Sequence, residues 1–283
     1  MEADHVRRII YSRIDELPTL PAVVPRILKL MEDGRSNVSE VTEAVSRDPA
    51  LAAKILKAAN SAYYGFPQKI SDLERAVALL GFNMVRSLAL SIGVIDGMGG
   101  SGGDYAWEAL WIHSLAVASA MKLTDAAAGR HEGPSHFVVG LLHDVGKVVM
   151  HRFFPEAFDA ALGTGGKHAG LLDPANERAV FGMDHGEVGA MLLERWKFPV
   201  TICEPIARHH GGGPPADADT ALLRVADALA RKAAFTESPD LPYTAPAPEE
   251  LAVIGLEEKA AEAAVEELAE SEEKFRAFVT AIA

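Results

Sequence analysis

The sequence predicts an all-α protein, and three observations support that prediction. Helix-capping patterns recur along the chain, apolar residues repeat at helical spacing, and strand-like alternation is nearly absent. A glycine-rich segment, GMGGSGG at residues 97–103, interrupts the helices and has the composition of a flexible linker. We therefore expect a two-lobed helical fold, with an N-terminal helical lobe over residues 11–96, a second helical lobe over residues 104–245 and acidic C-terminal helices over residues 246–283.

Three helix starts can be placed in the first lobe. Asp48 followed by proline combines an N-cap residue with proline at the first helical position, so a helix should begin at PALAAKILKAAN. The tetrapeptide SDLE at residues 71–74 is a capping box that begins with Ser71 and precedes RAVALLG. Asn83 is the expected cap of the next helix, MVRSLALSIGV.

The second lobe begins with two long predicted helices. Asp104 can cap a helix that runs through Leu123, and Pro134 with Ser135 opens another that runs to about Met150. Further helices are expected after Asp184, Pro199 and Asp219, with a kink or restart at Pro205, and two closing helices are expected from Pro246 onward.

Composition excludes several classes of function. The net charge of −13 argues against sequence-independent binding to nucleic acid, which requires a basic face. More than half of that charge, −7, lies between Glu249 and Arg276, as is typical of a solvated helical face. The single cysteine, Cys203, indicates a reducing compartment. The start resembles no signal peptide and the longest apolar stretch is too short to span a bilayer, so we expect a soluble cytoplasmic protein without membrane contact.

The predicted helix FVVGLLHDVGKVVM is apolar on nearly every side, yet it contains His143, Asp144 and Lys147. Their spacing of three and four residues places them on one face. Burying a carboxylate and an ammonium without partners costs on the order of several kcal/mol. A divalent metal would compensate Asp144, and a bound phosphate would compensate Lys147. The alternative is an internal Asp144–Lys147 ion pair with His143 as a core histidine.

Further imidazole and carboxylate side chains recur on separate predicted helices. They are His113, His185, His209, His210 and Asp227. Each also has a structural interpretation, as a core histidine, a first-turn residue, a solvated helix end or a salt-bridge partner. Asp227, for example, has the right spacing to pair with Arg224 and Arg231. Seven such groups on five helices, in an order that can converge, favour a shared metal site.

The ligand types indicate the class of metal. Imidazoles with carboxylates and no thiolate suit iron, manganese, nickel, cobalt or zinc rather than magnesium. The two oxygens of Asp144 could bridge two ions, which in such sites lie roughly 3.5–4 Å apart, clamp a phosphoryl oxygen and generate a hydroxide. The pattern therefore predicts phosphoester hydrolysis, with Asp144 and Lys147 at the reacting centre.

The order of these residues resembles the HD superfamily of metal-dependent phosphohydrolases, and HDVGK is similar to the signature of its HD-GYP branch. The resemblance of the first lobe is more specific. LPTLPAVVPRILKLMED, VTEAVSRDPALAAKILKAANSAYYG and ISDLERAVALLG resemble the N-terminal half of the HDOD domain. In the second lobe, HGEVGAMLLERWKFP fits the same family, and the resemblance covers about residues 15–235.

The resemblance implies a ligand set. One ion would be held by His113, His143, Asp144 and Asp227, and the second by Asp144, His185, His209 and His210. The expected metal is two ions of iron, or of manganese, nickel, cobalt or zinc, with Lys147 near the substrate phosphate. The chain departs from the HD-GYP pattern because GGGPPADAD follows the histidine pair in place of a GYP segment. Ala109 stands where some relatives have a carboxylate that helps to hold a third ion, so two ions are expected.

Two functions remain open. The first is a metal-dependent phosphohydrolase or phosphodiesterase acting on a nucleotide-like signal, with a phosphoester or cyclic nucleotide as its ligand. The second is a signal-transduction module that contacts a signalling protein, with a structural or sensory metal cluster, because many HDOD proteins have lost these ligands. A dinucleotide hydrolase would need several basic residues beside the metals. Besides Lys147, the candidates are Arg130, Arg152, Lys167 and Arg208.

Overall fold

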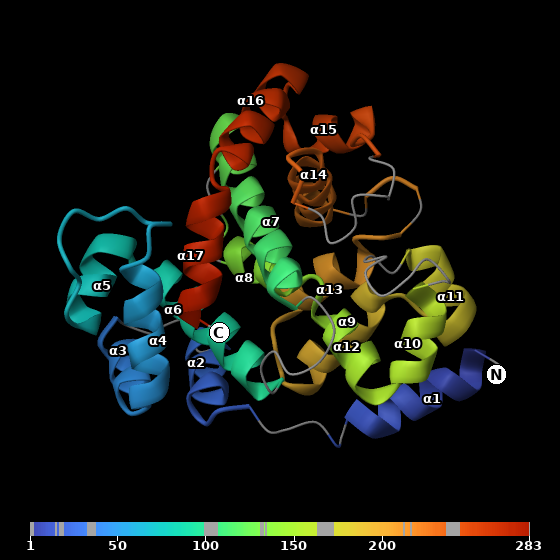
Figure 1. Ribbon diagram of the computed structural model, residues 1–283, viewed down its shortest axis with the longest axis horizontal. Helices are drawn as coiled ribbons and strands as arrows, with labels where there is room; N and C mark the ends of the chain where they lie inside the picture. The colour runs from blue at the N-terminus through green and yellow to red at the C-terminus, as the bar shows by residue number, and fades with distance from the viewer. Residues whose placement is uncertain are drawn as a thin grey trace. The chain divides into compact units, whose positions relative to one another are not determined.

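The computed structural model describes residues 3–14, 16, 20–32, 38–98, 107–130, 133, 135–162, 173–211, 213–215, 217–235 and 244–282. Within these ranges every regular element is a helix and no strand is present, which confirms the predicted all-α fold (Figure 1). The expected cap at Asp104, the helix start at Pro134, the basic candidate Lys167 and most of the glycine-rich segment lie outside the described residues.

The chain divides into two compact units. Unit 1 comprises Met1–Leu17 and Gly103–Ala269, and unit 2 comprises Pro18–Gly102 and Glu270–Ala283. The helices of unit 1 are α1 (Ala3–Ile14), α7 (Trp107–Ala127), α8 (His136–Leu142), α9 (Val145–Phe153), α10 (Pro155–Leu162), α11 (Pro174–Phe181), α12 (His185–Arg195), α13 (Val200–Arg208), α14 (Ala218–Lys232), α15 (Pro248–Ile254) and α16 (Glu258–Ala269). Those of unit 2 are α2 (Val23–Glu32), α3 (Val38–Ser46), α4 (Pro49–Ala59), α5 (Leu73–Leu80), α6 (Phe82–Gly97) and α17 (Glu272–Ile282).

Unit 1 is built around α7, whose residues from Leu110 to Met121 are all buried. The helices α8, α14 and α16 pack against α7, while α12 packs against both α9 and α13. Close approach is possible where α8 crosses α7, because a Cβ added to Gly140 would meet the Ala118 backbone at 2.5 Å. This buried framework brings the C-terminal ends of α8 and α13 and the N-terminal end of α12 near one another, together with Asp227 inside α14.

In unit 2 the C-terminal helix α17 packs against α4 (Figure 1). The rings of Phe275 and Phe278 on α17 lie 6.0 and 5.2 Å from the ring of Tyr63, measured between centroids. Lys54 of α4 donates to the carbonyl of Ile282 at 2.9 Å. The last helix of the chain therefore completes the core of the unit that contains most of the first lobe.

The helix starts of unit 2 follow the capping rules, with two corrections. Asp48 caps α4 as predicted, and its side chain accepts from the backbone N–H of Leu51. The cap of α5 is Asp72 rather than Ser71, because the Asp72 carboxylate accepts from the backbone N–H three residues later. The prediction that Asn83 caps the next helix was wrong. That helix begins at Phe82, immediately after Gly81, which has a φ of 86°.

The helix predicted to run to Met150 is interrupted. It forms two helices, α8 and α9, and His143 and Asp144 lie in the turn between them. The side chain of His143 explains the break, because its Nδ1 lies 2.8 Å from the Gly140 carbonyl, which an uninterrupted helix would offer to the Asp144 N–H. The interruption places both side chains at a helix junction.

Three later predictions also needed correction. The helix with Asp227 starts after Asp217 rather than Asp219. Pro205 lies inside α13, which does not restart there. Three helices rather than two follow Pro246, because Gly255 adopts a left-handed φ of 72° and ends α15.

Among the described residues, no single helix is both long and apolar enough to cross a bilayer. The pair α5 and α6 meets the criteria of length and composition together, with a bend of 117° between the two helices. Most of α6 is buried within unit 2.

Candidate metal centre

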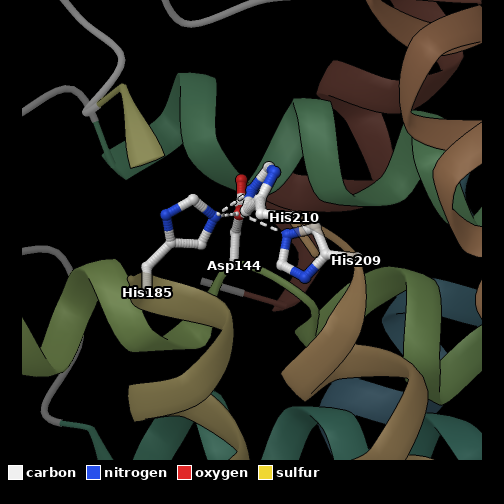
Figure 2. A group of neighbouring side chains, drawn as sticks. All are labelled: Asp144, His185, His209 and His210. Atoms are coloured by element: carbon white, nitrogen blue, oxygen red, sulfur yellow. Dashed lines mark hydrogen bonds and ion pairs between the residues drawn. The ribbon is translucent and has the colours of Figure 1, made fainter. Parts of the chain in front are cut away.

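Seven side chains of unit 1 converge in two groups. Group 1 consists of His113, His143 and Asp227, and group 2 consists of Asp144, His185, His209 and His210. Within each group the ligand atoms lie within 4.8 Å of one another. Figure 2 shows the three imidazoles of group 2 gathered around Asp144. The structure thus brings together all seven side chains that the sequence singled out.

Asp144 connects the two groups. Its Oδ1 lies 2.8 Å from His185 Nε2 and 3.9 Å from His209 Nε2. Its Oδ2 lies 3.3 Å from His143 Nε2 and 3.7 Å from His113 Nε2. One carboxylate oxygen faces each group, and this is the arrangement that a bridging ligand requires.

Three imidazole rings are oriented through their Nδ1 atoms. In His113, His143 and His209, Nδ1 lies 2.7 to 2.8 Å from a backbone carbonyl oxygen. A carbonyl only accepts, so Nδ1 carries the proton and Nε2 keeps the lone pair that a metal requires. The carbonyls belong to Phe235, Gly140 and Ile206.

Glu177 orients the fourth ring, and sequence analysis missed it. This residue of α11 is fully buried, and its Oε1 lies 2.7 Å from His185 Nδ1. Its Oε2 also accepts from the backbone N–H of His185 at 2.6 Å. A carboxylate behind a histidine is a common support for metal ligands. The separation of eight residues across a helix boundary gave no periodic signal.

Glycine allows α9 and α12 to approach closely enough to bring Asp144 and His185 together. A Cβ added to Gly146 would lie 1.9 Å from the His185 carbonyl oxygen and 2.7 Å from the Gly189 nitrogen. A Cβ on Gly186 would lie 2.8 Å from the His209 ring. Both contacts are shorter than any side chain tolerates, so the site depends on backbone packing at these positions.

Charged neighbours shift the pKa values of Asp144 and His185. Burial opposes ionisation of Asp144, but His143, Lys147 and His185 outweigh it and hold the pKa of Asp144 well below its ordinary value. Burial likewise lowers the pKa of His185, but Glu177 and Asp144 reverse the effect and raise it to about 9. A positive charge at His185 is therefore favoured, whether a proton or a metal supplies it.

The pair His209 and His210 behaves in the opposite way. Burial holds the pKa of both rings well below the ordinary value, and neighbouring histidines add to the effect. Both rings are therefore neutral near neutral pH. A neutral imidazole is the form that binds a metal.

Three buried polar atoms support a fit between these residues and a metal. They are His113 Nε2, His143 Nε2 and His209 Nε2. Within the described part of the chain, none of them has a hydrogen-bond partner in suitable geometry. Leaving a buried polar group without a partner costs about 1–3 kcal/mol each. Nitrogen and oxygen donors concentrated at one point match the donor set of a divalent transition metal.

Lys147 lies behind Asp144. Its Nζ donates to Asp144 Oδ2 at 2.6 Å, and the side chain is fully buried. The ion pair considered as an alternative to a metal site therefore exists, yet it accompanies the convergence of the other ligands. The structure places Lys147 where it neutralises and orients Asp144.

A cavity of about 400 Å³ opens beside the ligands and is lined by His209, His210 and Asp227. Two basic residues also line it, Arg224 and Arg231. Arg231 donates from Nε to Asp227 Oδ1 at 2.9 Å. The sequence had suggested both arginines only as surface partners of Asp227.

The basic candidates chosen from the sequence lie elsewhere. Arg130 binds the carboxylate of Asp125, and Arg208 pairs with Glu204 on the surface of α13. Neither residue is among those lining the cavity, and Arg152 is not among them either.

Two arginines fix the corner that carries His209 and His210. Arg224 donates to the Arg208 carbonyl at 2.8 Å from Nη2. Arg178 donates to the His210 carbonyl at 3.1 Å and also binds the Asp184 carboxylate. The C-terminal end of α13 is therefore held on both sides of the histidine pair.

Known proteins share this architecture. A solved HDOD domain protein of unknown function from Geobacter sulfurreducens is 28% identical, covers 99% of this chain and 97% of its own, and superposes with a TM-score of 0.78. A proposed phosphohydrolase from Shewanella amazonensis SB2B shares the fold at 22% identity and a TM-score of 0.72, with 97% and 98% of the two chains covered.

A curated relative extends the comparison. An uncharacterized protein of Treponema pallidum is 27% identical over 202 residues, or 71% of this chain. The matched region spans 39% of that relative's own length.

The family model of the HDOD domain matches residues 17–211. That range is more than half of the chain and contains every converging side chain except Asp227. The chain therefore belongs to the HDOD domain family.

Proposed function

We propose that this protein is a metal-dependent phosphoester hydrolase with a dinuclear centre. The observation that carries the proposal is the orientation of the Asp144 carboxylate. Its Oδ1 faces His185, and its Oδ2 faces His143. Group 1 with Asp144 Oδ2 would hold one ion, and the rest of group 2 with Oδ1 would hold the second. Bound ions of this kind supply Lewis acidity to a phosphoryl group and lower the pKa of water.

The residues of the chain have distinct roles in this proposal. Four of the histidines would bind through Nε2, because carbonyl oxygens hold the Nδ1 protons of His113, His143 and His209, and Glu177 holds that of His185. Lys147 acts through Asp144, whose ionised form it stabilises. The substrate phosphoester would enter through the cavity lined by His210 and Asp227.

The donor set favours particular metals. Imidazole nitrogens and carboxylate oxygens without a thiolate suit iron, with manganese, nickel, cobalt and zinc as alternatives. We propose two ions of iron as the resident metal. The phosphohydrolase description of the Shewanella amazonensis protein, which shares the fold, is compatible with this chemistry.

A signalling module with a structural metal cluster is the second candidate. One observation favours it: Arg224 donates to carbonyls and to Glu250, and Lys147 is fully buried, so few basic groups of the described residues face the cavity. A dinucleotide hydrolase would need several such groups to neutralise its substrate. Contact with a signalling protein would then be the output.

A substrate screen on metal-loaded protein distinguishes the two candidates. Cyclic dinucleotides, nucleotides and simple phosphomonoesters would be tested with wild type and His143→Ala. The hydrolase proposal expects turnover of at least one compound and its loss in the variant, because His143 is a ligand of group 1. Turnover that survives the substitution would indicate a different site. Inactivity across the panel in fully metal-loaded protein would favour the signalling module.

A further inference from the structure

Group 2 joins ligands from two different helix ends. His185 is the first residue of α12, and His210 follows the C-terminal end of α13. The Nε2 atoms of the two rings lie 2.8 Å apart, next to the Asp144 carboxylate (Figure 2). The distance between these two ligand atoms therefore depends on how the start of α12 is held against the end of α13.

Arg178 of α11 connects the two helix ends. Its Nη2 donates to the Asp184 carboxylate and, at 3.1 Å, to the His210 carbonyl. Asp184 is the N-cap residue of α12, and its other carboxylate oxygen accepts from the backbone N–H of Glu187 at 2.9 Å. Because Asp184 directly precedes His185, one guanidinium nitrogen holds the backbone beside both ligands.

The helix that carries Arg178 is itself well anchored in unit 1. Asp173 caps the first turn of α11, and Phe181 at its end is fully buried, with its ring 6.1 Å from the ring of Phe154 between centroids. α11 also packs on α1 and α10. It therefore gives Arg178 a fixed base, as it does for Glu177, which orients the His185 ring.

Group 1 has supports of a different origin. The ring of His113 is oriented by the Phe235 carbonyl, and that of His143 by the Gly140 carbonyl. Asp227 accepts from a residue of its own helix, α14. All of these supports lie outside α11. Loss of a side chain from α11 should therefore affect the two groups unequally.

We propose that Arg178 is a positioning residue for the second ion of the centre, the one that group 2 would hold. It acts through Asp184 and the His210 carbonyl and is not a ligand itself. The proposal rests on the dinuclear centre of the proposed function and assigns the affinity for one of its ions to a side chain outside the ligand set. Because 43% of that side chain is exposed, replacing it leaves no cavity in the core.

A cobalt(II) titration of metal-free protein, followed by visible absorption, tests the proposal. Wild type should bind two ions. Arg178→Met should bind one ion as wild type does and the other about tenfold or more weakly, because the two helix ends are no longer joined. Arg178→Lys should recover part of the loss, since an ammonium keeps the charge and has three donors. A general loss of stability would instead weaken both ions alike.

Arg208→Met is the matched control. Arg208 directly precedes His209 in the sequence, and 48% of its side chain is exposed, close to the exposed fraction of Arg178. Its guanidinium pairs with Glu204 of its own helix and joins no second segment in that pair. Arg208→Met removes an equal charge from the same region and should bind both ions as wild type does.

Two further backgrounds identify which ion is affected. Asp227→Ala should retain only the ion of group 2, and His210→Ala only the ion of group 1. Adding Arg178→Met should weaken cobalt binding about tenfold or more in the Asp227→Ala background. The same substitution should leave cobalt affinity unchanged in the His210→Ala background.

The outcomes separate this inference from the proposed function. Wild-type affinity for both ions in Arg178→Met, or an equal loss at both, would overturn the inference and leave the dinuclear centre standing. A wild type that binds fewer than two cobalt ions contradicts the dinuclear centre and removes the basis of the inference with it. Circular dichroism checks the folding of each variant, and Arg178→Gln would replace Arg178→Met if the latter does not fold.

Discussion

At the residue scale, the centre depends on which nitrogen of each imidazole carries the proton. The ligand residues themselves were predictable, because histidine and aspartate are unusual in apolar helices such as FVVGLLHDVGKVVM. The groups that orient these ligands were not predictable. The carbonyls of Phe235, Gly140 and Ile206 could belong to any residue type, so only the folded backbone reveals them.

Glu177 is a testable support at this scale. Glu177→Gln keeps the size of the side chain but weakens its hold on His185 Nδ1, and metal affinity should fall roughly 10–100-fold. Glu187→Gln is the control, since it removes an equal charge from the capping box of α12 without touching the His185 ring. Affinities would be measured by competition with a chelating dye. Equal affinities in the two variants would contradict the role of Glu177.

His136 provides a pH test independent of the metal centre. Burial disfavours its charged form, but hydrogen bonds to Asp219 and Asp125 outweigh burial and raise its pKa above the ordinary value of 6.5. The raised pKa means that protonated His136 adds to the free energy of unfolding. This contribution is complete below pH 6.5 and is lost as pH rises through the pKa of the folded state. The stability difference between wild type and His136→Gln, measured by urea unfolding, should therefore shrink as pH rises. A difference that stays constant or grows with pH would refute this account.

At the element scale, capping and periodicity predicted where most helices lie. Asp48, Asp184 and Pro199 precede helices as expected. The break at His143 was not predictable from periodicity, because the apolar pattern continues through it and the cause is a side-chain bond to the Gly140 carbonyl. The third closing helix was missed because one glycine, Gly255, divides an otherwise continuous pattern.

The contact between α9 and α12 offers a test at this scale. Gly146→Ala would force a methyl group into the His185 carbonyl at 1.9 Å, so the helices must separate and stability should fall by about 1–3 kcal/mol. Metal affinity should fall as well, because Asp144 and His185 would move apart. Gly97→Ala is the control, since its Cβ would meet nothing closer than 3.4 Å. Denaturant unfolding that gives the same stability for both variants would contradict the packing argument.

At the scale of the whole molecule, each unit is closed by a segment distant in sequence. α1 packs on α11 and α12 within unit 1, although more than a hundred residues separate them, and α17 packs on α4 within unit 2. The all-α class was predictable because it depends on local signals. The grouping of the terminal helices was not, since it depends on tertiary contacts that no local pattern encodes.

The most direct test of the dinuclear proposal is the metal content of purified, folded protein. Protein prepared under reducing, chelator-free conditions would be examined by elemental analysis for wild type, Asp227→Ala, His210→Ala and Asp144→Ala, with circular dichroism as the check on folding. We expect two ions per chain in wild type. One ion should remain in Asp227→Ala and in His210→Ala, because each substitution removes a ligand of one group. No ion should remain in Asp144→Ala, because Asp144 faces both groups. Asp144→Asn, which keeps the size of the side chain, would replace Asp144→Ala if the latter fails to fold. Substantially less than one ion in wild type, or an Asp144 variant that retains as much metal as wild type, would contradict the proposal.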